Sequence, residues 1–323
     1  MCQIQSKKLL IFDEIQQVQG WEKAINSISI EYNADIYITG SNAYLLSLEL
    51  STLISGKYVE IKILSLSFKE YFEYYNDRNI SREEIYNNYF KYGELPQLLI
   101  LPNKKTIYDF LSSIYDIVIL KDVLSRNKIR DIDLIKRVFA FICGNIGNII
   151  STNKIANYIA KEAKLDSSIR PATVGNILEM LENAFIIFKV SRYDVKGKEI
   201  LKSLEKYYVA DSGLKNFVVD YGLENYGYTI ENVIYLELIR RGYKVYVGKN
   251  EAKEIDFVAK KGDITVYYKV TETLLSQSTQ KREVSSFSGT NDFHEKIIIT
   301  TDKTYTTNLK GIKIINIIDF LLS

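Results

Sequence analysis

Short apolar runs alternate with segments of helical spacing over the first 76 residues. The apolar runs that we expect to be strands are Leu9–Phe12, Ile36–Ile38 and Lys57–Leu64. The segments expected to be helices are Trp21–Tyr32, Asn42–Leu53 and Phe68–Tyr75, the last with Ser67 in the N-cap position. Short buried strands that alternate with helices are typical of a parallel α/β sheet. Residues 1–76 are therefore predicted to form part of such a sheet.

Residues 77–221 have the pattern of successive helices followed by a pair of strands. Ser81 and Glu84 have the spacing of a capping box, and Pro102 stands at the start of a long amphipathic helix that ends near Arg126. Further helices are expected at Asp131–Phe141, Ser151–Lys164 and Pro171–Ala184, and strands at Phe185–Tyr193 and Glu199–Val209. Helix, turn, helix and hairpin in this order are typical of a winged-helix domain.

The pattern changes again at Gly222. The expected elements are a helix at Glu224–Arg241, strands at Lys244–Gly248, Glu254–Lys260 and Ile264–Val270, a helix at Ser276–Phe287 and a strand at Lys296–Thr300. Their order is α-β-β-β-α-β. The sequence thus predicts an α/β protein of three parts, covering residues 1–76, 77–221 and 222–323.

The composition excludes several classes of protein. The chain has 323 residues, a formal net charge of +2, two cysteines and one histidine. Zinc sites that need several His and Cys ligands are excluded, as is a disulfide framework, so we expect a reducing compartment, the cytoplasm. No run reaches the roughly 18 apolar residues of a membrane helix. Because the charges balance, any binding of nucleic acid depends on a local basic patch.

Two carboxylates follow the first apolar run directly. Leu9–Phe12 leads into Asp13 and Glu14, which is the form of a Walker B strand end. A buried parallel strand delivers such carboxylates to the sheet edge where nucleotides bind. There Asp13 would hold Mg²⁺ through water and Glu14 would orient the attacking water. The polar segment Thr39–Asn42 ends the next strand, where a small polar residue can touch a γ-phosphate. A strand that merely ends in a polar turn remains the alternative.

Further short motifs follow in order along nearly the whole chain. They are Leu9–Glu14, Ile38–Asn42, Ser55–Val59, Leu66–Tyr71, Tyr92-Gly93, Leu95-Pro96, Leu120–Val123, Asn127–Arg130, Gly144–Gly147, Lys206–Tyr208, Asp211, Gly213-Leu214, Glu231-Asn232 and Glu254–Phe257. In order and spacing the chain resembles prokaryotic AAA-family ATPases in which the ATPase core precedes an uncharacterised C-terminal domain. The resemblance implies ATP and Mg²⁺ as cofactors, with Ser41 and Asn42 at the γ-phosphate. It also puts Lys57 where the family usually carries an arginine finger.

The resemblance lacks the loop that ATP binding requires. P-loop ATPases hold the phosphates with the amides and lysine of a G-x-x-x-x-G-K-[ST] segment ahead of the Walker B strand. Each Gly-Lys pair here, at Gly56, Gly197 and Gly248, is followed by a residue other than Ser or Thr. We therefore expect a chain truncated before its P-loop, through a split gene, a mis-called start or decay, which does not hydrolyse ATP alone. An upstream P-loop fragment is then one expected partner, because an apolar strand edge is left beside Leu9–Phe12.

The winged-helix pattern predicts a surface for DNA. The reading helix would present Thr173 and Asn176, with Lys154, Lys161, Lys164 and Arg170 nearby, while Lys189, Arg192, Lys196, Lys198 and Lys202 lie in or beside the hairpin. The reading helix carries no Lys or Arg of its own between Pro171 and Ala184, so any binding would be electrostatic and modest. A winged helix that docks a protein, or that is purely structural, remains the alternative.

The last part of the chain resembles the PD-(D/E)XK restriction-endonuclease-like core. The resemblance is carried by Glu231, Asp256 and Lys269, which in that core would be two carboxylates for Mg²⁺ and a lysine that activates water. The position two before Lys269 should be acidic, but it is Tyr267. We therefore expect a degenerate nuclease site that does not cut DNA.

Two functions follow from these observations. The first is a truncated AAA-type ATPase associated with DNA, with Asp13, Glu14 and Ser41 at the nucleotide. The second is a non-enzymatic module that binds DNA or protein. Oligomers are compatible with either function.

Overall fold

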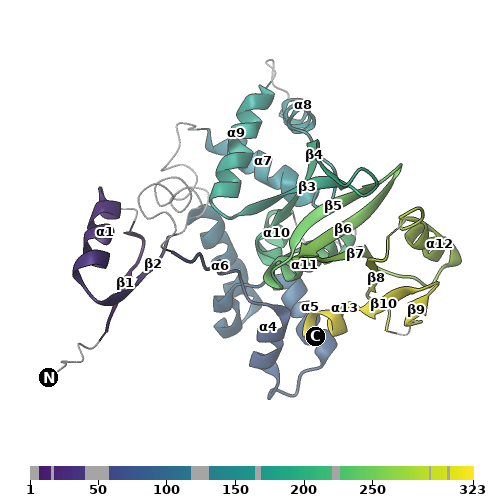
Figure 1. The fold of residues 1–323 in the computed structure, drawn as a ribbon, viewed down its shortest axis with the longest axis horizontal. Coiled ribbons are helices and arrows are strands. Elements are labelled where there is room, and N and C mark those ends of the chain that lie inside the picture. The colour runs from purple at the N-terminus through teal and green to yellow at the C-terminus, as the bar shows by residue number, and fades with distance from the viewer. Residues whose placement is uncertain are drawn as a thin grey trace.

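The computed structural model describes most of the chain. The described ranges are 7–15, 18–40, 58–117, 131–163, 169–219, 226–290, 292–303 and 306–323, without the side chains of residues 202 and 203. Within them a small N-terminal unit, a group of helices and a large mixed sheet follow one another along the chain (Figure 1). None of the helices in these ranges has the length and apolar character that a membrane crossing needs.

The N-terminal unit confirms the predicted parallel pairing. Strands β1 (Lys8–Phe12) and β2 (Ala34–Ile38) pair in parallel, and helix α1 (Trp21–Glu31) connects them. Trp21 and Ile25 of α1 are buried against apolar residues of both strands. Parallel strands need a crossover connection, and α1 provides it here.

The segment after β2 differs from the prediction. The expected helix Asn42–Leu53 lies outside the described residues. The sequence predicts a strand at Lys57–Leu64, but residues 58–64 form none. In the described part of the chain, β1 and β2 pair only with each other. A strand needs a neighbour for its backbone hydrogen bonds, so high β propensity alone leaves this segment irregular.

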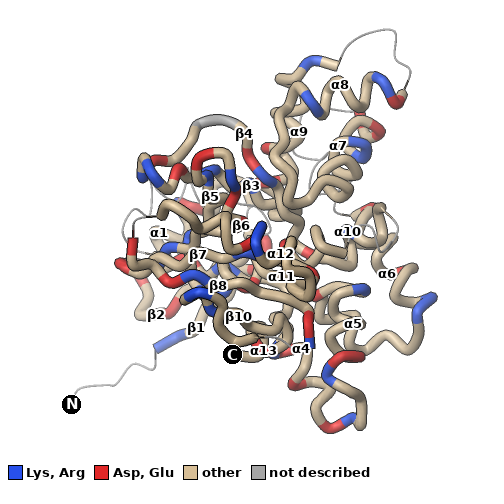
Figure 2. The backbone as a smooth tube through the Cα atoms, turned by 90° about the vertical axis from the view of Figure 1, so that its right-hand side faces the viewer, with Lys and Arg blue, Asp and Glu red and all other residues tan. Residues whose placement is uncertain are grey.

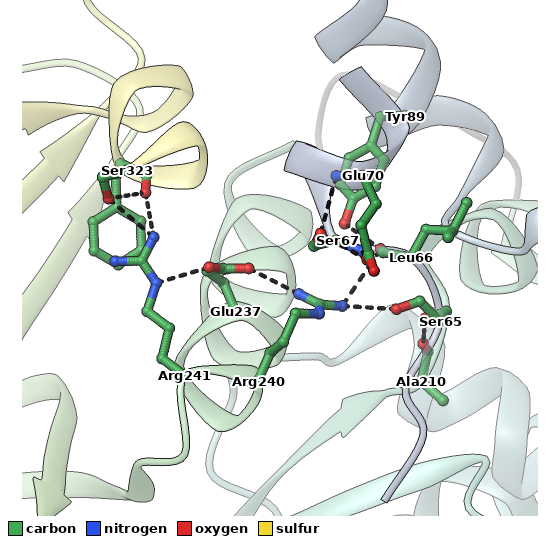
Figure 3. A network of polar contacts seen from close by, with 11 residues as sticks. Ser65, Leu66, Ser67, Glu70, Tyr89, Ala210, Glu237, Arg240, Arg241 and Ser323 are labelled. Atoms are coloured by element: carbon green, nitrogen blue, oxygen red, sulfur yellow. Dashed lines mark hydrogen bonds and ion pairs between the residues drawn. The ribbon is translucent and has the colours of Figure 1, made fainter. Parts of the chain in front are cut away.

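Residues 65–67 attach this segment to the body of the protein (Figure 3). The Arg240 Nη2 donates hydrogen bonds to the carbonyl oxygens of Ser65 and Leu66, at 3.0 and 3.4 Å. The Tyr89 hydroxyl also donates to the Leu66 carbonyl, and the Ser65 hydroxyl donates to the carbonyl of Ala210. Residues 65 and 66 thus contact three residues that lie far apart in the sequence.

A group of helices follows, of which the first has the predicted limits, while the end of the helix predicted to reach Arg126 lies outside the described residues. These helices are α4 (Phe68–Tyr75), α5 (Arg82–Tyr92), the short 3₁₀ helix η2 (Pro96–Ile100) and α6 (Lys104–Ile117). Ser67 caps α4 in a full capping box with Glu70. At α5 the Ser81 hydroxyl accepts from the Glu84 amide, which is the N-cap half of the predicted box.

The next helices and the hairpin agree with the predicted order. They are α7 (Ile132–Gly144), α8 (Thr152–Glu162), α9 (Pro171–Asn183), β3 (Ile187–Asp194) and β4 (Glu199–Val209). Ile150, between α7 and α8, forms an isolated antiparallel bridge with Glu205 of β4. The sequence did not predict the short helix α10 (Ser212–Val219) that follows.

The hairpin belongs to the large C-terminal sheet. Helix α11 (Tyr226–Arg240) leads into β5 (Lys244–Asn250), β6 (Lys253–Lys261), β7 (Ile264–Thr271), helix α12 (Gln277–Ser285) and β8 (Glu295–Thr300), and then β9 (Asn308–Leu309), β10 (Ile312–Asn316) and α13 (Ile317–Leu322). The strand order is β4-β3-β5-β6-β7-β8-β10-β9. Because β3 pairs in parallel with β5, the parts predicted as separate domains share one sheet.

Helices cover both faces of this sheet. On one face, apolar residues of α11 and α13 pack with Phe257, Tyr268 and Ile299 in the main core. On the other face, Val284 of α12 packs against a smaller cluster that includes Ile298. Neighbouring residues of β8 thus point to opposite cores, as the two-residue period of a strand requires.

One lysine is buried in the main core without a carboxylate partner in the described residues. The Lys215 Nζ of α10 donates a hydrogen bond to the Thr229 Oγ1 of α11 at 2.6 Å. Lys215 is almost fully buried. Burial disfavours the ammonium form and lowers the pKa of Lys215 from 10.5 to about 8.

Replacing Lys215 with methionine is expected to stabilise the protein at pH 7. Below pH 8 the folded state holds a buried ammonium at a cost, and that cost disappears as pH rises from about 8 towards 10.5, where the folded chain binds fewer protons than the unfolded one. Urea unfolding at pH 7 should show Lys215→Met more stable by about 1–3 kcal/mol, with the difference shrinking at pH 10. The exposed Lys105→Met serves as control, and a Lys215→Met effect that is independent of pH would contradict this account.

Candidate functional site

The acidic residues after β1 and the polar residue after β2 meet at one edge of the N-terminal sheet. The Thr39 hydroxyl donates a hydrogen bond to the Asp13 Oδ1. The same Thr39 Oγ1 accepts a hydrogen bond from the Glu14 amide at 3.1 Å. The Thr39 amide in turn donates to the Phe12 carbonyl at 2.9 Å. Parallel strands bring their carboxyl ends together, and Thr39 ties both acidic residues to the end of β2.

This edge carries one exposed carboxylate and a hydroxyl that orients it. Asp13 is exposed, so its carboxylate can take up a hydrated cation. Glu14 has a φ of 49°, a left-handed conformation that costs a non-glycine residue energy. Three further predicted site residues, Ser41, Asn42 and Lys57, lie outside the described residues. Among the described residues, no three His, Cys, Asp or Glu side chains form a group that could hold a metal directly.

A second cluster of charged side chains lies where α11 meets the large sheet. The Lys206 Nζ of β4 lies 3.0 Å from the Glu231 Oε1 of α11 and 2.6 Å from the Glu254 Oε1 of β6. The Tyr208 hydroxyl donates to the same Glu231 oxygen at 2.5 Å. Gly147 lies so close that a side chain there would collide with the Glu231 carboxylate. The backbone at Gly147 therefore closes one side of this cluster, and the Lys206 ammonium group lies between its two carboxylates.

Ionisation in this cluster follows from burial and pairing. Burial raises the pKa of Glu231, and the neighbouring Lys206 opposes that rise. Burial alone would lower the pKa of Lys206, but Glu231 and Glu254 raise it above its ordinary value. Lys206 therefore stays charged and neutralises the carboxylates beside it.

The other two residues of the predicted nuclease-like site form a pair of their own. The Lys269 Nζ of β7 donates to the Asp256 Oδ1 at 2.6 Å, and the Val270 amide donates to the Asp256 Oδ2 at 2.7 Å. Glu283 of α12 lies 3.6 Å from the same lysine. Burial alone would lower the pKa of Lys269, but Asp256 and Glu283 raise it. Both oxygens of Asp256 thus have protein partners.

Tyr267 occupies the position where the resemblance calls for a carboxylate. Its hydroxyl donates to the Asp292 Oδ2 at 2.8 Å, and its ring is buried in the smaller core. Glu231 contacts Lys206 rather than Lys269. Lys206, Glu254 and Glu283 were not assigned to this site from the sequence. No local pattern distinguishes Lys206 from the exposed lysines of the same hairpin.

Basic and acidic residues are mixed over the predicted DNA surface, both on the helices and in the hairpin (Figure 2). Lys154 and Arg170 are exposed, at the start of α8 and the N-cap of α9, and Asn176 is exposed on α9 with Thr173 half-buried beside it. In the hairpin, Lys196 is ion-paired with Glu251, while Lys198 is exposed in the turn. Lys154, Arg170 and Lys198 are therefore exposed cations, whereas Lys196 is neutralised by Glu251.

Replacing Lys206 with methionine is expected to lower the free energy of unfolding by about 3–5 kcal/mol, because Glu231 would keep a buried charge without a counter-ion. Urea denaturation followed by circular dichroism measures the change. The control is Lys189→Met, a half-exposed lysine 3.8 Å from Glu182, for which the loss should stay below about 1 kcal/mol. Equal losses in the two variants would show that the Lys206 cluster is not a buried charge centre.

Two family models match the chain. Residues 1–72 match an AAA domain, and residues 83–225 match a domain of unknown function (DUF8612). A solved structure, protein VC1899 from Vibrio cholerae, aligns with 98% of this chain and 89% of that chain at a TM-score of 0.22 and 10% identity, too low for an argument about fold.

Relatives extend over most of the chain. An uncharacterized protein of Haemophilus influenzae is 39% identical over 322 residues, which cover 98% of this chain and 78% of that protein. Uncharacterized protein MJ1544 of Methanocaldococcus jannaschii is 31% identical, over 88% of this chain and 65% of its own length. Uncharacterized protein MJ1637 of the same organism is 22% identical, over 62% of this chain and 46% of its own. The chain therefore belongs to the family of the Haemophilus influenzae protein, and its N-terminal part matches the AAA domain.

Proposed function

We propose that this protein is an AAA-type ATPase whose Asp13 and Glu14 act on magnesium-bound nucleotide. The observation that carries the proposal is the Thr39 hydroxyl, which bonds to both the Asp13 carboxylate and the Glu14 amide at the carboxyl edge of β1 and β2. Nucleotides bind at this edge in open parallel sheets. The match of residues 1–72 to an AAA domain supports the same assignment.

Each residue of the edge has a separate task in this proposal. Bound nucleotide supplies the phosphoryl group, and Mg²⁺ neutralises its charge. Asp13 holds the hydrated ion through its carboxylate, and Thr39 keeps that carboxylate in one orientation. Glu14 orients the attacking water and accepts its proton. Ser41 and Asn42 contact the γ-phosphate, and Lys57 supplies positive charge without the planar fork of an arginine.

In this proposal the phosphates of the nucleotide are bound by another segment. No G-x-x-x-x-G-K-[ST] sequence occurs in the 323 residues. Backbone amides and a lysine of such a loop provide most of the phosphate binding in P-loop proteins. We therefore propose that a P-loop segment, in cis or as a separate chain, completes the site.

The chain alone is expected not to hydrolyse ATP, and supplying a P-loop segment is expected to restore saturable binding and turnover. In the completed protein Glu14→Gln should retain ATP binding but lose at least about 100-fold in turnover, since only the water-orienting group is neutralised. Phosphate release and fluorescent nucleotide titration measure the two effects. The control is Glu31→Gln, an exposed carboxylate at the end of α1. Unchanged turnover in Glu14→Gln would contradict the assignment, and Glu14-dependent hydrolysis by the chain alone would contradict the need for a P-loop.

A second function, association with DNA, is favoured by the hairpin and the helices before it. The bridge between Ile150 and Glu205 joins the segment before α8 to the hairpin, which supports a winged-helix arrangement. Arg170 and Lys154 are exposed beside α9. We propose that this surface binds DNA phosphates and that the C-terminal sheet keeps a nuclease-like order without cleavage, because Tyr267 stands where a metal-binding carboxylate is needed. A module that binds only protein is the alternative.

Binding to duplex DNA is expected to be weak, steeply dependent on salt and nearly independent of sequence. Removing Arg170 and Lys154 together should weaken binding and reduce the slope of log K against log salt by about 2, one for each lost phosphate contact. Fluorescence anisotropy at several salt concentrations measures both values, with the exposed Lys105→Ala as control. The DNA should remain uncut in Mg²⁺. A slope unchanged in the double variant would place any DNA contact elsewhere, and cleavage lost in Asp256→Ala would show an active nuclease.

A further inference from the structure

Two carboxyl groups are buried together where α5 meets α10. Glu94 follows α5 and Asp211 precedes α10, and their exposed fractions are 0% and 4%. The two carboxyl groups lie in hydrogen-bonding contact with each other. Within the described ranges, neither of them forms an ion pair with a lysine or an arginine. Two negative charges this close, in a buried place without a counter-ion, repel strongly, so a proton between them is favoured.

Backbone and hydroxyl groups donate to all four oxygens of the pair. The Asp211 Oδ1 accepts a hydrogen bond from the Leu214 amide at 2.6 Å, and the Oδ2 accepts one from the Glu94 amide at 2.7 Å. The Glu94 Oε1 and Oε2 accept from the Ser212 hydroxyl and the Ser212 amide, at 2.8 and 2.6 Å. Asp211 has amide donors at both oxygens and stands at the N-terminus of α10, where a negative charge is stabilised. The geometry therefore places the charge on Asp211 and the proton on Glu94.

The ionisation of the two groups has the same direction. Burial raises the pKa of Glu94, and the charge of Asp211 raises it further. Burial also raises the pKa of Asp211, but the hydrogen bond from Glu94 and those from backbone amides oppose that rise. Glu94 is thus the group that keeps its proton at a pH where an exposed glutamate is charged.

The two chain segments that carry the pair approach each other closely. A side chain at Gly93 would meet the Asp211 Oδ1 at 2.6 Å, and one at Gly213 would lie 1.8 Å from the Tyr92 carbonyl oxygen. Glycine is therefore required at both positions. Because backbone encloses the pair in this way, a second charge there has little access to water.

The other titratable groups around the pair do not supply a counter-ion. Burial raises the pKa of Tyr89 of α5, with a contribution from Glu94, so this phenol stays neutral, as does Tyr71 of α4 for the same two reasons. Arg240 and Glu237 of α11 also act on Tyr89, but they pair with each other at 2.8 Å. Lys215, the cation of α10, donates to the Thr229 hydroxyl of α11.

The same two segments hold residues 65 and 66, which connect the N-terminal unit to α4. The Leu66 amide donates a hydrogen bond to the Glu94 carbonyl at 2.9 Å. The Ser65 hydroxyl donates to the carbonyl of Ala210, the residue before Asp211, at 3.1 Å (Figure 3). A change in the spacing between Glu94 and Asp211 therefore acts on both contacts.

We propose that Glu94 and Asp211 share one proton and form a proton-dependent clamp that holds residues 65 and 66 against the body of the protein. With the proton in place, the Glu94 hydroxyl donates to the Asp211 carboxylate and the two segments stay together. Without the proton, two buried charges repel each other and the contacts to residues 65 and 66 loosen. The clamp does not depend on nucleotide or DNA binding.

The pH dependence of Glu94→Gln tests the shared proton. The unfolded chain releases the Glu94 proton above its ordinary pKa of 4.5, whereas the folded chain keeps it, so the contribution of the pair to stability is complete below that pH and declines as pH rises. The glutamine amide donates in place of the hydroxyl and does not titrate. The melting temperature of the natural chain should therefore fall relative to that of the variant by about 2 °C for each pH unit between about pH 5 and 7. A difference that is constant with pH, or that changes in the opposite direction, overturns the shared proton.

Hydrogen exchange in Asp211→Asn tests the hold on residues 65 and 66. An asparagine at 211 has one oxygen for two amide donors, so exchange of the Leu66 amide is expected to be at least about fivefold faster in mass spectrometry. The matched control is Asp131→Asn, at the exposed N-cap of α7, where the side chain accepts only from Leu134 and asparagine caps as well as aspartate. Unchanged exchange at Leu66 in Asp211→Asn, or an equal increase in Asp131→Asn, overturns the clamp. If Asp211→Asn does not fold, exchange at Leu66 in the natural chain, corrected for its intrinsic pH dependence, should increase with pH and stay constant in Glu94→Gln, and equal behaviour of the two chains overturns the clamp.

Discussion

The buried Lys206 ammonium is the interaction on which the C-terminal half of the protein depends. It joins β4, α11 and β6 through Glu231 and Glu254, and it does so inside the main core. A buried ion without a close counter-ion lowers the stability of the folded state by several kcal/mol. The contact therefore ties the hairpin to α11 and β6, while the pairing of β3 with β5 makes the hairpin part of the large sheet. Lys206 also neutralises Glu231, to which the resemblance to a nuclease core had assigned a metal-binding role.

At the edge of the N-terminal sheet, the carboxylate is exposed instead of buried beside a lysine. Asp13 there is exposed, and Thr39 orients it without neutralising it. A carboxylate that faces solvent can bind a hydrated cation, whereas Asp256 has both oxygens occupied by protein donors. The contrast between the two acidic sites is the physical reason for proposing chemistry at the first and only binding or structure at the second.

Much of the fold could be predicted from the sequence, because local patterns specify single elements. The limits of β4 agree with the prediction at both ends, and Asp13, Glu14 and Thr39 meet as parallel strands require. The pairing of β3 with β5 could not be predicted, since it joins residues about 50 positions apart without a local signal. Lys206 was missed for a related reason: its burial depends on Glu231 and Glu254, which come from distant elements. Residues 58–64 show the converse, a strong strand pattern without a neighbour to pair with in the described chain.

The central claim is that the edge formed by Asp13, Glu14 and Thr39 binds nucleotide through a magnesium ion. The most direct measurement is calorimetric titration of the protein, completed with a P-loop segment, with ATP in the presence of Mg²⁺ and again in the presence of a chelator. If the claim is correct, Asp13→Asn lowers the affinity about tenfold or more with Mg²⁺ and leaves the affinity without metal unchanged. An equal loss under both conditions, or no loss with Mg²⁺, would contradict it.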